Sequence, residues 1–166
     1  MATFVDHIEQ SKRNVVFLSK INSTLDNCWD WQVTVCFYTA LHLINAHIAS
    51  KTNSNYLSHY QVEKIINPFN DSSPACLDDN VYKSYTKLFQ LSRRSRYLVG
   101  ENNQSSGSTI IQPGKSTHSL HLRKSIHHLD LIIDFVKLNY SVEFPTVEIV
   151  CKDLNGLTFK NFQITN

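Results

Sequence analysis

The stretch DWQVTVCFYTALHLINAHIA, residues 30–49, decides the fold. Apolar and aromatic side chains fall on nearly every side of a helix formed by it, from Trp31 through Phe37 to Ile48. A helix that is apolar almost all round must be covered by several neighbours, so this stretch predicts a central helix. Its most apolar part, residues 33–49, is too short, and too often interrupted by polar residues such as Thr34 and Asn45, to span a bilayer.

Other segments on both sides of this stretch have apolar residues at helical spacing. They are residues 3–25, 58–66, 79–97 and 119–139. Thr3 is expected to cap the first of them, and Asn67-Pro68 to end the second, because the residue before proline disfavours the helical region. Residues 99–117 are polar and without periodicity, which indicates a long loop. The chain is therefore expected to form four long helices and one short helix.

The C-terminal residues have a different pattern. Residues 147–153 and 157–164 have the composition of strands, and they flank Asn155-Gly156, a strong short-range signal for a β-hairpin. We therefore predict an all-α domain over residues 1–139, with a β-hairpin extension over residues 140–166 that packs on the same domain.

Length and composition narrow the classes of protein. A chain of 166 residues suits one domain, and 42% hydrophobic with 18% charged residues argues against a disordered chain, a collagen, a coiled-coil rod or a highly basic nucleic-acid wrapper. Asp6, His7 and Glu9 stand where a signal peptide would be apolar, so we expect a cytoplasmic protein that does not bind membranes. The four cysteines are too widely spaced for a zinc knuckle or redox motif, and we expect neither a metal nor a cofactor.

The basic character of the chain is concentrated in residues 91–128. This segment contains six Lys and Arg residues and one acidic residue, Glu101, so its net charge is +5, compared with +2 for the whole chain. Such a segment can attract phosphates and steer a polyanion, although a solvated surface has the same composition. Its cations are Arg93, Arg94, Arg96, Lys115, Arg123 and Lys124, and its histidines are His118, His121, His127 and His128.

Three blocks resemble the HEPN domain family. Residues 31–46, WQVTVCFYTALHLINA, are similar to the second helix of that family, with its aromatic-Tyr-x-x-x-His-x-x-x-Ala pattern. Residues 82–98, YKSYTKLFQLSRRSRYL, resemble a helix that ends in Ala-Arg-Tyr, and LHLRKSIHHLDLII, from Leu120, resembles the last helix. The resemblance covers roughly residues 3–139. It implies an up-and-down helical bundle that usually dimerises, and many members are metal-independent endoribonucleases of toxin–antitoxin or antiviral systems.

The resemblance also implies site residues. The nuclease signature of the family is an Arg followed after four to six residues by a His, and Arg123 and His128 have this spacing; Lys124 stands where an Asn or Asp is common. His128 would be the base for a ribose 2′-hydroxyl, and Arg123 would stabilise the transition state. On a regular helix these two side chains point about 140° apart, so a site across a homodimer axis is expected. The expected RNA or phosphate contacts are Arg93, Arg96, Tyr97 and Lys124.

Purely structural roles, and a second function, are alternatives to these hypotheses. Arg123, His127, Asp130 and Asp134 share a helix face, which also fits a solvated ladder of ion pairs. Tyr38 and His42 are one turn apart and suggest a hydrogen-bonded pair in the core, and His59 suggests a cap or a surface residue. The alternative function is a catalytically inactive dimerisation, nucleotide-binding or protein-interaction module, with a partner strand on its hairpin edge. A cognate antitoxin or a nucleotidyltransferase-like protein is the partner that the resemblance implies.

Overall fold

The computed structural model describes residues 2–52, 54, 58–98 and 116–165. Its five helices lie where the sequence predicts them. They are α1 (Phe4–Thr24), α2 (Trp29–Thr52), α3 (His59–Ile66), α4 (Asp79–Tyr97) and α5 (Ser119–Tyr140). Most of the predicted 99–117 loop, with Glu101 and Lys115, lies outside the described residues.

Local capping explains where two of the helices begin. Thr3 Oγ1 accepts a hydrogen bond from Asp6 N at 3.2 Å, and the Asp6 carboxylate accepts one from Thr3 N at 2.7 Å. This reciprocal pair satisfies backbone donors that the first turn of α1 would otherwise leave without partners, so the predicted Thr3 cap is confirmed. Ser58 and Gln61 form the same arrangement at the start of α3.

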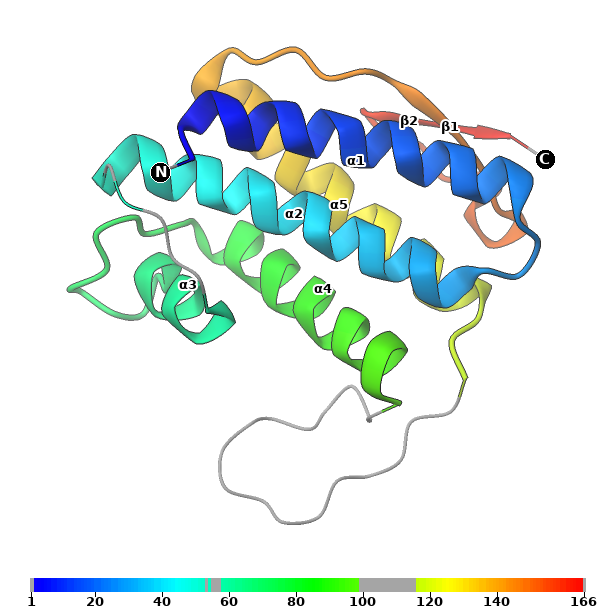
Figure 1. The fold of residues 1–166 in the computed structure, drawn as a ribbon, viewed down its shortest axis with the longest axis horizontal. Coiled ribbons are helices and arrows are strands. Elements are labelled where there is room, and N and C mark those ends of the chain that lie inside the picture. Colours follow the sequence, from blue (N-terminus) through cyan, green and yellow to red (C-terminus); the bar gives the residue numbers. More distant parts are fainter. Residues whose placement is uncertain (1, 53, 55–57, 99–115, 166) are drawn as a thin grey trace.

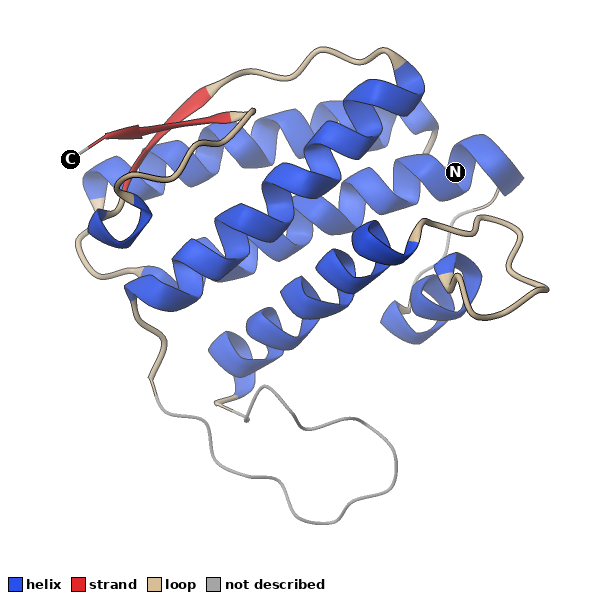
Figure 2. Cartoon of the chain, turned by 180° about the vertical axis from the view of Figure 1, so that it is seen from behind, coloured by secondary structure: helices blue, strands red, loops and turns tan. Residues whose placement is uncertain are grey.

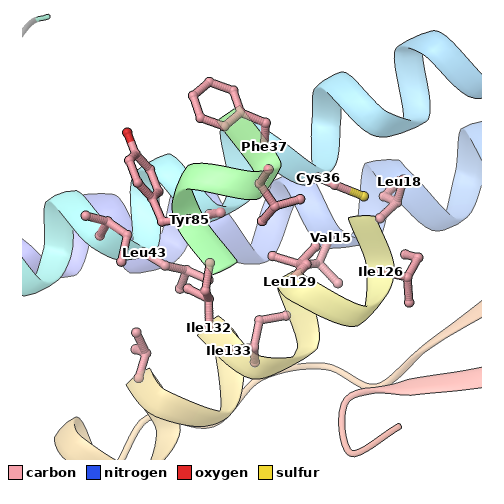
Figure 3. Packing of buried hydrophobic residues seen from close by; sticks show 14 of the residues in the cluster. Val15, Leu18, Cys36, Phe37, Leu43, Tyr85, Ile126, Leu129, Ile132 and Ile133 are labelled. Carbon is pink, nitrogen blue, oxygen red and sulfur yellow. The ribbon is translucent and has the colours of Figure 1, made fainter. Parts of the chain in front are cut away.

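Helix α2 lies at the centre of the molecule, as predicted, between α1 and α4 and against α5 (Figure 1). Its side chains are buried on several sides; Phe37 meets Tyr85 of α4, while Cys36 lies near Leu18 of α1 (Figure 3). The expectation that this stretch is too short and too polar to span a bilayer is wrong by length and composition alone, because α2 extends to Thr52 and is, among the described residues, the one helix with the length and apolar composition of a membrane span. Most of it is buried by the other helices, which fits the core helix of a soluble protein.

The predicted β-hairpin is wrong. Strands β1 (Val147–Val150) and β2 (Phe162–Thr165) pair in parallel, with Val147 opposite Phe162, and a short 3₁₀ helix, η1 (Lys152–Leu154), begins the connection. Gly156 does adopt the positive φ of a turn, 78°, but the chain then runs back along the sheet before β2 starts (Figure 2).

Contacts with α5 and α1 explain this course. The buried Asp130 carboxylate of α5 accepts hydrogen bonds from the backbone N of Lys160 at 3.2 Å and of Asn161 at 2.9 Å. These bonds hold the chain against α5 immediately before β2. The outer edge of β1 is bound to α1, because Asn22 exchanges two hydrogen bonds with the backbone of Val150 and Ser19 donates to Glu148 O. The strands are thus arranged by the helices rather than by the turn between them.

Candidate functional site

A pocket of about 580 Å³ lies along the first half of α5. Its size is within the range of pockets that hold small ligands. Most of its lining residues belong to α5, and the connection between the two strands contributes one apolar side chain, that of Leu157. The lining residues are His118, Leu120, His121, Arg123, Lys124, His127, His128 and Leu157.

The structure brings the two predicted catalytic residues to this one pocket. Arg123 is exposed and His128 is half-buried, and both side chains border the pocket of a single chain despite their different directions on α5. Lys124, predicted to contact RNA, lines it as well. None of the described lining residues is acidic, so the pocket has a positive character that suits an anion.

Two further histidines of the pocket lie at the N-terminus of α5. His118 precedes the helix and donates its backbone N–H to Nδ1 of His121 at 3.2 Å, and their ring centroids are 4.1 Å apart. His121 is buried in the first turn, and its own backbone oxygen accepts a bond from the hydroxyl of Ser125 at 2.9 Å. These contacts hold the start of the helix, and therefore the wall of the pocket, in place.

His128 is the most perturbed imidazole of the site. Its Nδ1 lies 3.3 Å from Ser84 Oγ on α4. Burial, and then the positive charges of His127, Lys87 and Lys124, lower the pKa of His128 to about 4. The ring is therefore neutral at pH 7, the form in which an imidazole can accept a proton, although a low pKa makes it a weaker base.

The ion-pair ladder that the sequence suggested along α5 is wrong. Asp130 is buried, and its carboxylate binds Lys160 and Asn161 of the C-terminal segment instead of a neighbour on the helix. Asp134 pairs with the side chain of Lys160 at 2.6 Å. The acidic residues of α5 therefore support the C-terminal segment, and Arg123 is left facing the pocket.

The other predicted RNA contacts form a second group near the end of α4, outside the pocket. The Arg96 guanidinium lies 5.1 Å from the ring centroid of Tyr97 and 5.6 Å from that of Tyr38, and it donates to Tyr38 OH at 3.2 Å. Arg93 lies 5.8 Å from the ring centroid of Phe89. Tyr97 is 62% exposed, so this group presents an aromatic ring beside a guanidinium.

Contacts in the same region contradict the predicted Tyr38–His42 hydrogen bond and a capping role for His59. Tyr38 binds Arg96 rather than His42, whose Nδ1 lies 3.1 Å from Nδ1 of His7 on α1. Ser58, rather than His59, caps α3. The half-buried His59 ring packs 5.1 Å from the ring of Phe89, and burial, together with the nearby charge of Arg96, lowers the pKa of His59.

Sequence reasoning missed the contribution of α4 to the pocket region. Ser84 and Lys87 both influence His128, but a single serine and a single lysine in an amphipathic helix give no local signal of a site. Only the packing of α4 against α5 shows their relation to His128.

Metal-ligating residues do not gather in the part of the chain that the structure describes: no three His, Cys, Asp or Glu residues are placed to hold an ion. All four cysteines are free thiols. Comparison of the chain with protein-family models, characterised proteins and solved structures found no match.

Proposed function

We propose that this chain is a HEPN-like, RNA-directed protein of the cytoplasm, and that its α5 pocket is the site of a metal-independent endoribonuclease of a toxin–antitoxin or defence system. The four long helices would then form the up-and-down bundle of that family, and the active form would be a homodimer. The observation that carries the proposal is one pocket that holds a neutral imidazole, His128, beside a guanidinium, Arg123, with no acidic residue among its described lining.

The chemistry follows from these two groups. The neutral His128 ring takes the proton from a ribose 2′-hydroxyl, and the oxygen then attacks the adjacent phosphorus. The bond from phosphorus to the 5′-oxygen of the next nucleotide breaks, and this oxygen takes a proton from water while His128 returns its own proton to water. The products are a 2′,3′-cyclic phosphate and a 5′-hydroxyl end. Arg123 stays protonated and stabilises the negative charge on the phosphoryl oxygens in the transition state. DNA would not be cleaved, because it lacks the 2′-hydroxyl.

The group at the end of α4 would bind the same RNA through a base. Exposed aromatic rings stack on unpaired bases, and a guanidinium beside the ring adds an attraction to the base and to its phosphate. Tyr97 and Arg96 have this arrangement, with Arg93 close by over Phe89. We therefore assign single-stranded RNA, rather than a duplex, as the substrate form.

The test is digestion of single-stranded RNA in excess chelator by the wild type, Arg123→Ala and His128→Ala. We expect the wild type to leave 2′,3′-cyclic phosphate ends, and each variant to lose roughly 10²–10⁴-fold in rate. Arg13→Ala is the matched control, because Arg13 is an exposed arginine of α1 that bonds Gln10 and lies outside the pocket. A folded wild type that leaves all RNA intact, or variants that cleave at the wild-type rate, would refute the nuclease.

A catalytically inactive interaction module is the second candidate, and the low pKa of His128 favours it, because a weak base slows proton transfer. In this function the small sheet would receive the partner. One edge of β1 is paired with β2, and the other is bonded to Ser19 and Asn22 of α1. A partner strand would therefore pair with β2. For this second function we expect a bound partner protein to protect the β2 amides from hydrogen exchange, and we expect no RNA cleavage.

A further inference from the structure

Helices α4 and α5 pack against each other (Figure 2). Two residues of α4, Ser84 and Lys87, act on His128 of α5 across this contact. Ser84 and Lys87 are three residues apart, so they lie on the same side of α4. Ser84 is 3% exposed, and its Oγ is 3.3 Å from Nδ1 of His128. Lys87 is close enough for its charge to act on the same ring.

The charges that shift the pKa of His128 are all positive. His127 and Lys124 act on it from α5, and Lys87 acts on it from α4. All three disfavour a proton on the ring, after the larger effect of burial. An anion placed among them would cancel part of this repulsion, because opposite charges a few ångströms apart favour each other's charged form.

We infer that α4 completes the site: Ser84 positions the His128 ring, while Lys87 and Lys124 hold a phosphate group of the RNA substrate beside it. The identity of this substrate rests on the proposed function. If the Nδ1–H of His128 donates to Ser84 Oγ, the lone pair of its other nitrogen, Nε2, is available to the pocket, which is the tautomer that a base requires.

Bound phosphate also changes the strength of this base. Because binding and protonation are linked, an anion that raises the pKa of His128 is itself bound more tightly when the ring is protonated. The imidazole is thus a poor base in the empty site and a better one when RNA is present, which limits proton transfer to the complex.

The experiment measures the pKa of His128 by NMR in the folded, full-length protein labelled with ¹⁵N at histidine. Its signal is assigned by its loss in His128→Gln. Titrations are run in sodium chloride, in inorganic phosphate at equal ionic strength, and with a thymidine hexadeoxynucleotide that cannot be cleaved. The variants are Ser84→Ala and Lys87→Gln. Lys83→Gln is the control, since it removes the same charge from α4 at a residue that pairs with Asp79.

In the wild type we expect phosphate and the oligonucleotide to raise the pKa of His128. Lys87→Gln should raise this pKa in chloride, reduce the further rise in phosphate, and weaken oligonucleotide binding roughly tenfold, the effect of losing one charged hydrogen bond. Ser84→Ala should change the ¹⁵N shifts that report the tautomer without weakening oligonucleotide binding. Lys83→Gln should match the wild type in each measurement.

An anion that leaves the His128 titration unchanged in the wild type would overturn the inference, and so would a Lys87→Gln protein that titrates like Lys83→Gln. Unaltered ¹⁵N shifts in Ser84→Ala would overturn the role of Ser84. These results are independent of cleavage. If anions raise the pKa of His128 in a protein that cleaves no RNA, the anion site is supported and the nuclease is refuted. If Lys87→Gln cleaves RNA normally and binds the oligonucleotide as the wild type does, only the inference is refuted.

Discussion

Removal of the Asp130 carboxylate tests why the C-terminal strands run in parallel. Asp130 is 9% exposed, and its Oδ1 accepts hydrogen bonds from the backbone N of Asn161 at 2.9 Å and from Asn161 Nδ2 at 3.0 Å. Its Oδ2 accepts from Lys160 N at 3.2 Å. The substitution Asp130→Ala removes the carboxylate that accepts these three bonds, in a place where Asn161 is 2% exposed; Asn161 Nδ2 keeps only its bond of 3.3 Å to the backbone oxygen of residue 130.

The magnitude follows from the buried bonds. A hydrogen bond to a charged group contributes about 1.5–3 kcal/mol, and an unsatisfied buried donor has a cost of similar size. Asn161 loses two such bonds, whereas water can replace the acceptor for the exposed Lys160. We therefore expect Asp130→Ala to lower the free energy of unfolding by roughly 3–5 kcal/mol, a large part of the ~5–15 kcal/mol that a domain has.

Urea unfolding followed by circular dichroism measures this loss, and hydrogen exchange of the Asn161 and β2 amides shows where it arises. Asp130→Asn keeps one oxygen acceptor and should fall between the alanine variant and the wild type. Asp134→Ala is the control; it removes the half-buried partner of the exposed Lys160 side chain and should change the urea midpoint much less than Asp130→Ala does. A loss below about 1 kcal/mol in Asp130→Ala, or β2 amides that stay protected, would refute this account of the strand arrangement.

Three other measurements test the structure. Tyr85→Phe should be neutral or stabilise the protein by up to about 1 kcal/mol in urea unfolding, because the buried Tyr85 hydroxyl has no hydrogen-bond partner among the described residues; a large loss would show that this hydroxyl is bonded. Burial lowers the pKa of His128 from its ordinary 6.5 to about 4, so the unfolded chain binds the extra proton first and stability falls as the pH drops through this interval. With allowance for the partial exposure of His128, the free energy of unfolding falls by about 1–2 kcal/mol over this interval. The urea midpoint of His128→Gln should therefore lack this part of the pH dependence. A thiol reagent should modify the exposed Cys76 first and the buried Cys36, whose thiol pKa burial raises, only on unfolding; rapid labelling of Cys36 in the native protein would contradict its position.

The helices could be predicted from the sequence because their signals are local. Apolar spacing and the Thr3 cap act within a few residues, and they place α1 and α4 within one residue of the structure. The central position of α2 was also predictable, since a helix that is apolar on most sides has to be covered. Arg123 and His128 could be named from their spacing, but their shared pocket could not, because Leu157 and the start of α5 also form it.

The sequence by itself therefore determined five helices, most of their ends and the central one among them; α2 continues three residues beyond its predicted end. The tertiary structure alone decided the direction of β2, the role of Asp130 and the contact of His128 with α4. The physical reason is distance along the chain: Asp130 meets Asn161 across 31 residues and Ser84 meets His128 across 44. Such contacts depend on how the helices pack, and a local signal as strong as Asn155-Gly156 bends the chain without choosing the strand that it will join.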